Sequence, residues 1–133
     1  MTRSEAREIA FKVIFAYVSN DDFDLDKVIG ISHRDKDLDV DSYNFIANII
    51  KNLKEHFEEL KGKIESNSKD FAYSRIYKVD LSLMFLALVE IYYINTPVKV
   101  VINEVLNLAK TYSTPESSKY INGVIANILK VGA

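Results

Sequence analysis

The chain has no cysteine among its 133 residues. Disulfide bonds, thiolate metal sites and cysteine-based catalysis are therefore excluded for this sequence. Its two histidines, His33 and His56, lie too far apart in sequence to suggest a metal site. Hydrophobic residues make up 48% of the chain, which suits a single compact domain with a sizeable core.

Long hydrophobic runs are also missing. The longest apolar stretch, Leu81 to Ile94, spans 14 residues and includes Ser82 and Glu90. A helix that crosses a bilayer needs about 20 apolar residues, so this stretch predicts a buried core helix. The first residues, Met1 to Arg7, are polar and do not resemble a signal peptide. We therefore expect a cytoplasmic protein without a membrane role.

Neither sign of charge dominates the chain. The formal net charge of -2 argues against a strongly basic nucleic-acid binder. The charge is uneven, because the segment from Asn20 to Asp41 has a net charge of -5 and residues 71–133 have a net charge of +2. A modest positive face can therefore exist on an acidic chain.

Alternating aspartates in the acidic segment invite a calcium-loop interpretation: Asp35, Asp37, Asp39 and Asp41. An EF-hand loop that begins at the first of them needs glycine at its sixth position and glutamate at its twelfth. The chain has Val40 and Ile46 at those positions, so the sharp turn and the bidentate ligand are both missing. The pattern favours a solvated loop that ends in an aspartate N-cap.

Helical periodicity dominates the chain, and no convincing alternating strand is present. We predict an all-α fold, a bundle of about seven helices forming one domain over residues 1–133. A polar break at 66–70, preceded by Gly62, divides it into two packed subdomains of about 1–68 and 69–133. The expected helices span about 4–18, 25–29 (ending at Gly30), 41–64, 79–94, 96–110 and 114–130, with a turn or short helix at 71–77.

The last two predicted helices each begin with Thr-Pro. Threonine at an N-cap satisfies a backbone N–H, and proline at the first helical position removes one. We therefore predict that Thr96 and Thr114 are N-caps, each followed by the first residue of its helix.

The last helix begins with residues that suit an anion and a nucleobase. Lys119 and Tyr120 lie near its N-terminus, where a phosphate can meet exposed N–H groups and a base can stack on the ring. The alternative is that Tyr120 belongs to the core, with its hydroxyl at the surface. Gly123 costs a helix about 1 kcal/mol relative to alanine, so we expect close approach of another backbone or of a ligand there.

Arg3 and Arg7 lie four residues apart, on one face of the first predicted helix. They continue its apolar stripe, so we expect packed aliphatic stems and guanidinium groups at the edge of the bundle. Arginine in that position suits phosphate contact. Ion pairs with Glu5 and Glu8 in the same helix are the alternative.

Three further residues are candidates for a protein interface. Phe15 lies off the apolar stripe of the first helix. It is either an anchor of a protein interface or a residue covered by the acidic loop. Asp80 and Glu90 share one face of the hydrophobic helix. Together they indicate an acidic stripe that binds a basic partner protein, or, for Glu90, a structural ion pair. A catalytic role is disfavoured, because no second catalytic residue can be recognised in the sequence.

Four blocks of sequence, in this order, resemble the NusB transcription antitermination family: TRSEAREIAFKVIFAY, VDLSLMFLALVEI, VINEVLNLAK and SSKYINGVIANIL. The likeness covers nearly the full length, and the third and fourth blocks are its most specific part. It implies an all-helical RNA-binding adaptor in two subdomains, without enzymatic activity or cofactor.

The resemblance also implies partners. With ribosomal protein NusE, the family binds single-stranded boxA RNA in nascent transcripts, chiefly of ribosomal RNA operons. The complex helps RNA polymerase resist premature termination. The likeness implies RNA contact by Arg3, Arg7, Lys99, Lys119 and Tyr120, and we place NusE on the face of Phe15, Asp80 and Glu90.

The sequence departs from the family in its first helix, where Ser4 and Glu5 follow Arg3 and many members have more arginines. Two other interpretations stay open. One is a protein-binding helical adaptor without RNA contact, and the other is a stand-alone relative of the RNA-binding domain of ribosomal RNA methyltransferases. A monomer and a homodimer are equally compatible with the sequence.

Overall fold

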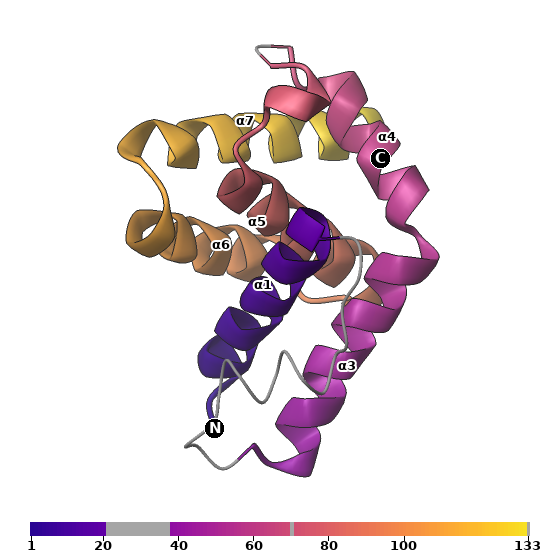
Figure 1. The fold of residues 1–133 in the computed structure, drawn as a ribbon, viewed down its shortest axis with the longest axis vertical. Helices are drawn as coiled ribbons and strands as arrows, with labels where there is room; N and C mark the ends of the chain where they lie inside the picture. Colours follow the sequence, from indigo (N-terminus) through magenta and orange to yellow (C-terminus); the bar gives the residue numbers. More distant parts are fainter. Residues whose placement is uncertain (21–37, 70, 133) are drawn as a thin grey trace.

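A computed structural model of the chain describes residues 1–20, 38–69 and 71–132 (Figure 1). The predicted short helix at 25–29, Gly30, His33, Asp35 and Asp37 lie outside the described residues. Helices account for nearly all of the described chain, and no strand occurs in it. The elements are α1 (Arg3–Asn20), α3 (Val40–Glu55), α4 (Phe57–Asn67), the 3₁₀ turn η1 (Tyr73–Arg75), α5 (Lys78–Val89), the π-helical turn η2 (Glu90–Ile94), α6 (Val98–Tyr112) and α7 (Pro115–Gly132). The all-α prediction is confirmed.

Helix α5 is the centre of the fold. All of its residues from Asp80 to Val89 are buried. Helices α1, α3, α4, α6 and α7 all pack against it, and Figure 1 shows it in their midst. The apolar stretch therefore is a core helix, as predicted. Within the described ranges, no helix combines the length and the apolar character that a bilayer span requires.

The predicted apolar stripe of α1 is buried at Ala6, Ala10, Val13 and Ile14. Helix α3, which packs beside it, begins at an aspartate N-cap as predicted: Asp39 accepts a hydrogen bond from the Ser42 N–H at 3.1 Å. Hydrogen bonds from Ser42 also lower the pKa of Asp39. The last two of the four alternating aspartates thus begin a helix.

The prediction of one long helix over 41–64 is wrong. The chain bends at His56 (φ -116°, ψ 17°), which separates α3 from α4. The bend lets α3 pack on α1 and α5 while α4 turns to pack on α7. Tyr93 stacks on His56 with ring centroids 4.0 Å apart. Gly62 lies inside α4, which ends at Asn67, within the polar break that the sequence indicates.

Of the two predicted Thr-Pro starts, one is confirmed and one is wrong. Thr114 Oγ1 accepts from the Ser117 N–H at 3.3 Å, and Pro115 is the first residue of α7. At the other start Pro97 is the N-cap of α6, without a side-chain capping bond. The Thr96 hydroxyl instead donates to Glu90 Oε1 at 3.0 Å, because the buried carboxylate needs donors.

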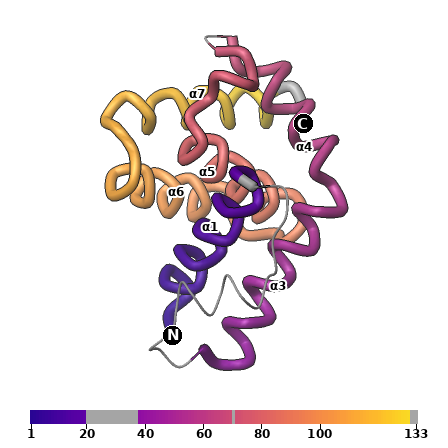
Figure 2. Tube along the Cα trace, in the orientation of Figure 1, coloured from indigo at the N-terminus to yellow at the C-terminus, as the bar shows by residue number. Residues whose placement is uncertain are grey.

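Buried residues from both sides of residue 68 join one hydrophobic core. The beginning of α1 and the whole of α7 lie at opposite ends of the molecule (Figures 1 and 2). The division into two subdomains stays a prediction.

Candidate functional site

An aromatic ridge on the surface of α7 separates two hollows. Phe71 and Tyr120 form the ridge, and both hollows are lined by these two residues and by Glu116. The lysine hollow, of about 460 Å³, is completed by Asn67, Lys69, Lys119, Gly123, Val124 and Asn127. The Asp80 hollow, of about 340 Å³, is completed by Arg75, Tyr77, Asp80, Thr114 and Ser117.

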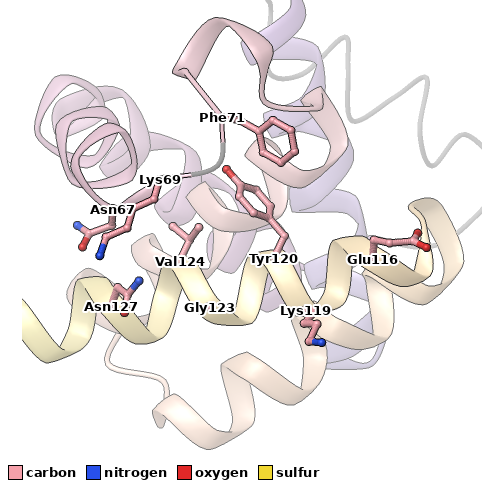
Figure 3. A pocket seen from close by; sticks show the side chains of 9 residues that line it. All are labelled: Asn67, Lys69, Phe71, Glu116, Lys119, Tyr120, Gly123, Val124 and Asn127. Atoms are coloured by element: carbon pink, nitrogen blue, oxygen red, sulfur yellow. The ribbon is translucent and has the colours of Figure 1, made fainter.

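Local contacts hold the ridge in place. The Phe71 and Tyr120 rings meet edge to face, with centroids 5.4 Å apart. Ser68 Oγ lies 2.6 Å from the Tyr120 hydroxyl and donates to the Phe71 carbonyl at 2.8 Å. Figure 3 shows Tyr120 pointing from α7 towards Phe71. Ser68 and Phe71 therefore form one aromatic surface with the first turns of α7.

The lysine hollow has cationic and amide groups around its rim. Lys69 and Lys119 are both exposed, and in Figure 3 they extend from opposite sides of the hollow. A Cβ added to Gly123 would meet no atom within 4 Å, so the expected close approach of another backbone is wrong for the described chain. The glycine instead leaves open space beside the lysines.

Asp80 is a buried carboxylate at the floor of the second hollow, with 5% of its surface exposed. It accepts hydrogen bonds from the Ser113 hydroxyl at 2.6 Å and the Ser117 hydroxyl at 2.9 Å. These bonds connect the beginning of α5 to the C-cap of α6 and to the first turn of α7. Because Asp80 and Glu90 are both buried, the interpretation of the two acids as a stripe that contacts a basic partner is wrong.

Arg7 and Glu90 form a buried ion pair. Arg7 Nε donates to Glu90 Oε2 at 2.5 Å and Arg7 Nη2 donates to Oε1 at 2.9 Å, with both side chains at most 3% exposed. Glu104 Oε1 lies 3.7 Å from Arg7 Nη1. The expected position of this guanidinium at the bundle's edge is therefore wrong, because Glu90 draws it into the core. For Glu90, the alternative of a structural ion pair is the observed one.

Arg3 stays at the surface as predicted, with 48% of its side chain exposed. Its guanidinium lies 4.2 Å from the centroid of the Phe45 ring and 3.4 Å from Asp41 Oδ2. The expected pairs within α1 are not formed by either arginine, since Arg3 pairs with Asp41 and Arg7 with Glu90.

The predicted RNA contacts therefore do not form one cluster. Lys119 and Tyr120 line the lysine hollow, whereas Lys99 is exposed in the first turn of α6 and lines neither hollow. The beginning of α1 lies at the other end of the molecule from α7 (Figure 2). An RNA strand that met all of the exposed residues would have to cross much of the protein surface.

Phe15 lies on a separate apolar surface, 38% exposed. It lines a hollow of about 180 Å³ with Phe11, Lys12, Val79 and Tyr112. The Tyr112 hydroxyl donates to Glu8, and this hydrogen bond together with burial raises the pKa of Tyr112 to about 12. Tyr112 thus keeps its proton and its bond to α1 at neutral pH.

Sequence reasoning missed several residues of the two hollows: Lys69, Phe71, Arg75 and Tyr77. They lie between α4 and α5, where no helical period indicates which side chains face outward. The one available signal was the run of aromatic residues that directly follows the polar break, at Phe71, Tyr73 and Tyr77.

Comparison with known proteins agrees with this fold. The model of the NusB family matches residues 4–130. The transcription antitermination protein NusB of Finegoldia magna is 34% identical over 98% of this chain and 95% of its own length. That of Staphylococcus carnosus is 37% identical over 96% and 99%.

Solved structures show the same architecture. T. maritima NusB superposes with a TM-score of 0.85, at 26% identity over 98% of this chain and 92% of that chain. A chain from a structure of antitermination factors NusB and NusE in complex with dsRNA gives a TM-score of 0.83, at 21% identity over 98% and 99%. That second likeness concerns the fold alone. The chain belongs to the NusB family.

Proposed function

We propose that the chain is a transcription antitermination factor that binds boxA RNA in nascent transcripts together with ribosomal protein NusE. It acts in the cytoplasm as a non-catalytic adaptor, chiefly at ribosomal RNA operons, and helps RNA polymerase avoid premature termination. The relatives' names support the antitermination role. The observation that supports RNA binding most directly is the ridge of Phe71 and Tyr120 beside Lys69 and Lys119.

The ridge suits a single strand rather than a duplex. Bases of single-stranded RNA are available to stack on aromatic rings, whereas those of a duplex are stacked on one another. The lysines offer phosphate contacts, and the amides of Asn67 and Asn127 offer hydrogen bonds to ribose or base edges.

Few cations are available for RNA, so a second protein surface is needed. With Arg7 buried, the exposed cations of the proposed site are Arg3, Lys69, Lys99 and Lys119. At ~0.7 per neutralised phosphate, these four contacts give a slope of about -3 in log K against log salt. Such a weak electrostatic contribution favours a three-body complex, in which NusE touches the same RNA and raises its effective concentration.

Tyr120→Ala is expected to weaken binding of a labelled boxA-type RNA by the protein–NusE complex about 5- to 150-fold, because stacking contributes ~1–3 kcal/mol per base. Fluorescence anisotropy over a salt series measures the affinity and its salt slope. Tyr120→Phe, which keeps the ring, should retain most of the affinity. Circular dichroism of both variants checks the fold. An unchanged affinity in the folded Tyr120→Ala variant would refute this RNA site.

For the protein partner we propose the exposed surface around Phe15. Phe15→Ala should weaken the complex with NusE, measured without RNA by isothermal titration calorimetry, by about 2 kcal/mol or more if the ring is an anchor. Phe71→Ala removes a ring that is more exposed than Phe15 from another surface, and it should leave the affinity for NusE unchanged. Equal effects of the two variants would place NusE elsewhere.

The rival interpretation is a protein-binding adaptor without RNA contact. It predicts a stable complex with NusE whose formation leaves the RNA free at every salt concentration. Tighter and salt-sensitive RNA binding by the pair than by either protein alone supports the adaptor that binds both.

A further inference from the structure

Two of the aromatic side chains that line the Asp80 hollow stay exposed in the folded protein. Phe71 is 48% exposed and Tyr77 is 56% exposed, although large apolar side chains gain from burial. Tyr77 is the N-cap residue of α5, and its side chain makes no capping hydrogen bond. Tyr120 completes the aromatic lining. With a volume of about 340 Å³, the hollow is within the range of sites that hold small planar groups.

The floor and the rim of this hollow differ in charge. Asp80 lies at the floor and Glu116 is an exposed second carboxylate, so a phosphate group is repelled from the interior. Arg75, exposed at the end of η1, is the cation of the lining and suits a phosphate outside. These charges thus favour a neutral group inside the Asp80 hollow and an RNA backbone phosphate at its rim, next to Arg75.

Asp80 has unused capacity to accept hydrogen bonds. An ionised carboxylate offers about four acceptor positions, and the hydroxyls of Ser113 and Ser117 use one on each oxygen. A ligand edge with N–H donors can therefore pair with Asp80 without displacing either serine. Guanine presents two adjacent donors on its Watson–Crick edge, whereas uracil presents one donor between two acceptors.

We propose that the Asp80 hollow binds one unstacked nucleobase of the RNA strand, with Phe71 and Tyr77 as stacking partners and Asp80 as the acceptor that favours guanine. This inference rests on the proposed function. The two hollows share the ridge of Phe71 and Tyr120, so a strand held at Lys119 reaches the Asp80 hollow by passing over that ridge. The ridge then separates two neighbouring bases.

The test combines protein variants with an abasic scan of a boxA-type RNA bound to the protein–NusE complex. At one position, removing the base should weaken binding to the wild type about 5- to 150-fold. Tyr77→Ala should weaken binding of the intact RNA by a similar factor. When the Tyr77→Ala variant binds the RNA that lacks this base, the affinity should be little lower than with either change alone. Replacing guanine by inosine at that position, which removes the amino group, should weaken binding to the wild type.

Phe15→Ala, measured at saturating NusE, is the control for an exposed ring outside both hollows. Any change that it causes should be the same factor for every abasic RNA, because Phe15 lies away from the proposed base site. If Tyr120→Ala weakens RNA binding but no abasic position is coupled to Tyr77, the nucleobase proposal is wrong and the RNA site stands. If Tyr77→Ala weakens binding of NusE in the absence of RNA, the hollow holds a protein side chain and the proposal is overturned. If Tyr120→Ala has no effect, the proposed RNA site itself fails.

Discussion

Arg7→Met is expected to lower the free energy of unfolding by about 3–5 kcal/mol, because it leaves Glu90 buried without its ionic partner. Glu90 has no exposed surface, and Arg7 supplies two of its side-chain hydrogen bonds. Among the described residues, only the Thr96 hydroxyl, at 3.0 Å, would remain as a side-chain donor to Glu90. Urea denaturation followed by circular dichroism at neutral pH measures the change.

Two further variants show whether the loss of stability comes from breaking a buried ion pair or from removing a surface charge. Arg3→Met removes an exposed arginine from the same face of α1 and should change the stability by about 1 kcal/mol or less. The double variant Arg7→Met/Glu90→Leu removes both buried charges and should recover most of the loss. Equal stabilities of Arg7→Met and Arg3→Met would contradict the buried pair.

The same variants decide what Arg7 does for RNA. Because its guanidinium is held by Glu90, the double variant should bind boxA-type RNA with NusE as the wild type does, provided that it folds. Arg3→Met should weaken that binding, because Arg3 is exposed. Weaker binding by a folded double variant would restore Arg7 as an RNA contact.

Phe85→Ala is expected to lower the free energy of unfolding by about 3–5 kcal/mol, because it creates a cavity at the centre of the core. Phe85 is fully buried in α5, and its ring stacks on Phe57 of α4 with centroids 5.0 Å apart. The substitution therefore loosens the contact between the central helix and α4. Urea denaturation measures the loss of stability as a lower urea concentration at the unfolding midpoint.

Phe71→Ala is the matched control for the core substitution. Its ring is 48% exposed, so the change should alter the stability by about 0.5 kcal/mol or less while it weakens RNA binding. Similar midpoints for Phe71→Ala and Phe85→Ala would contradict the burial of Phe85 in the native protein.

The sequence by itself determined most of the helices and their buried faces. The buried positions of α1, including Ala6, Ala10 and Ile14, follow the helical period, because a helix in a small domain must bury one stripe. Every residue of α5 from Leu83 to Val89 is apolar, so this helix had to lie at the centre. Local chemistry also predicted an aspartate N-cap, which is Asp39 in the structure, and the cap at Thr114, since each bond joins residues only three positions apart.

Tertiary structure decided what the local pattern left open. Arg3 and Arg7 share a face of α1, yet only Arg7 is buried, because its partner Glu90 comes from 83 residues further along the chain. The Thr96 hydroxyl does not cap α6 as expected, because it donates a hydrogen bond to the Glu90 carboxylate. Phe71 meets Tyr120 only because the chain bends at His56, between α3 and α4, so that α4 packs against α7. Periodicity describes one helix at a time, whereas ion pairs and the ridge of the candidate site form between helices, and only the packed fold determines which side chains meet.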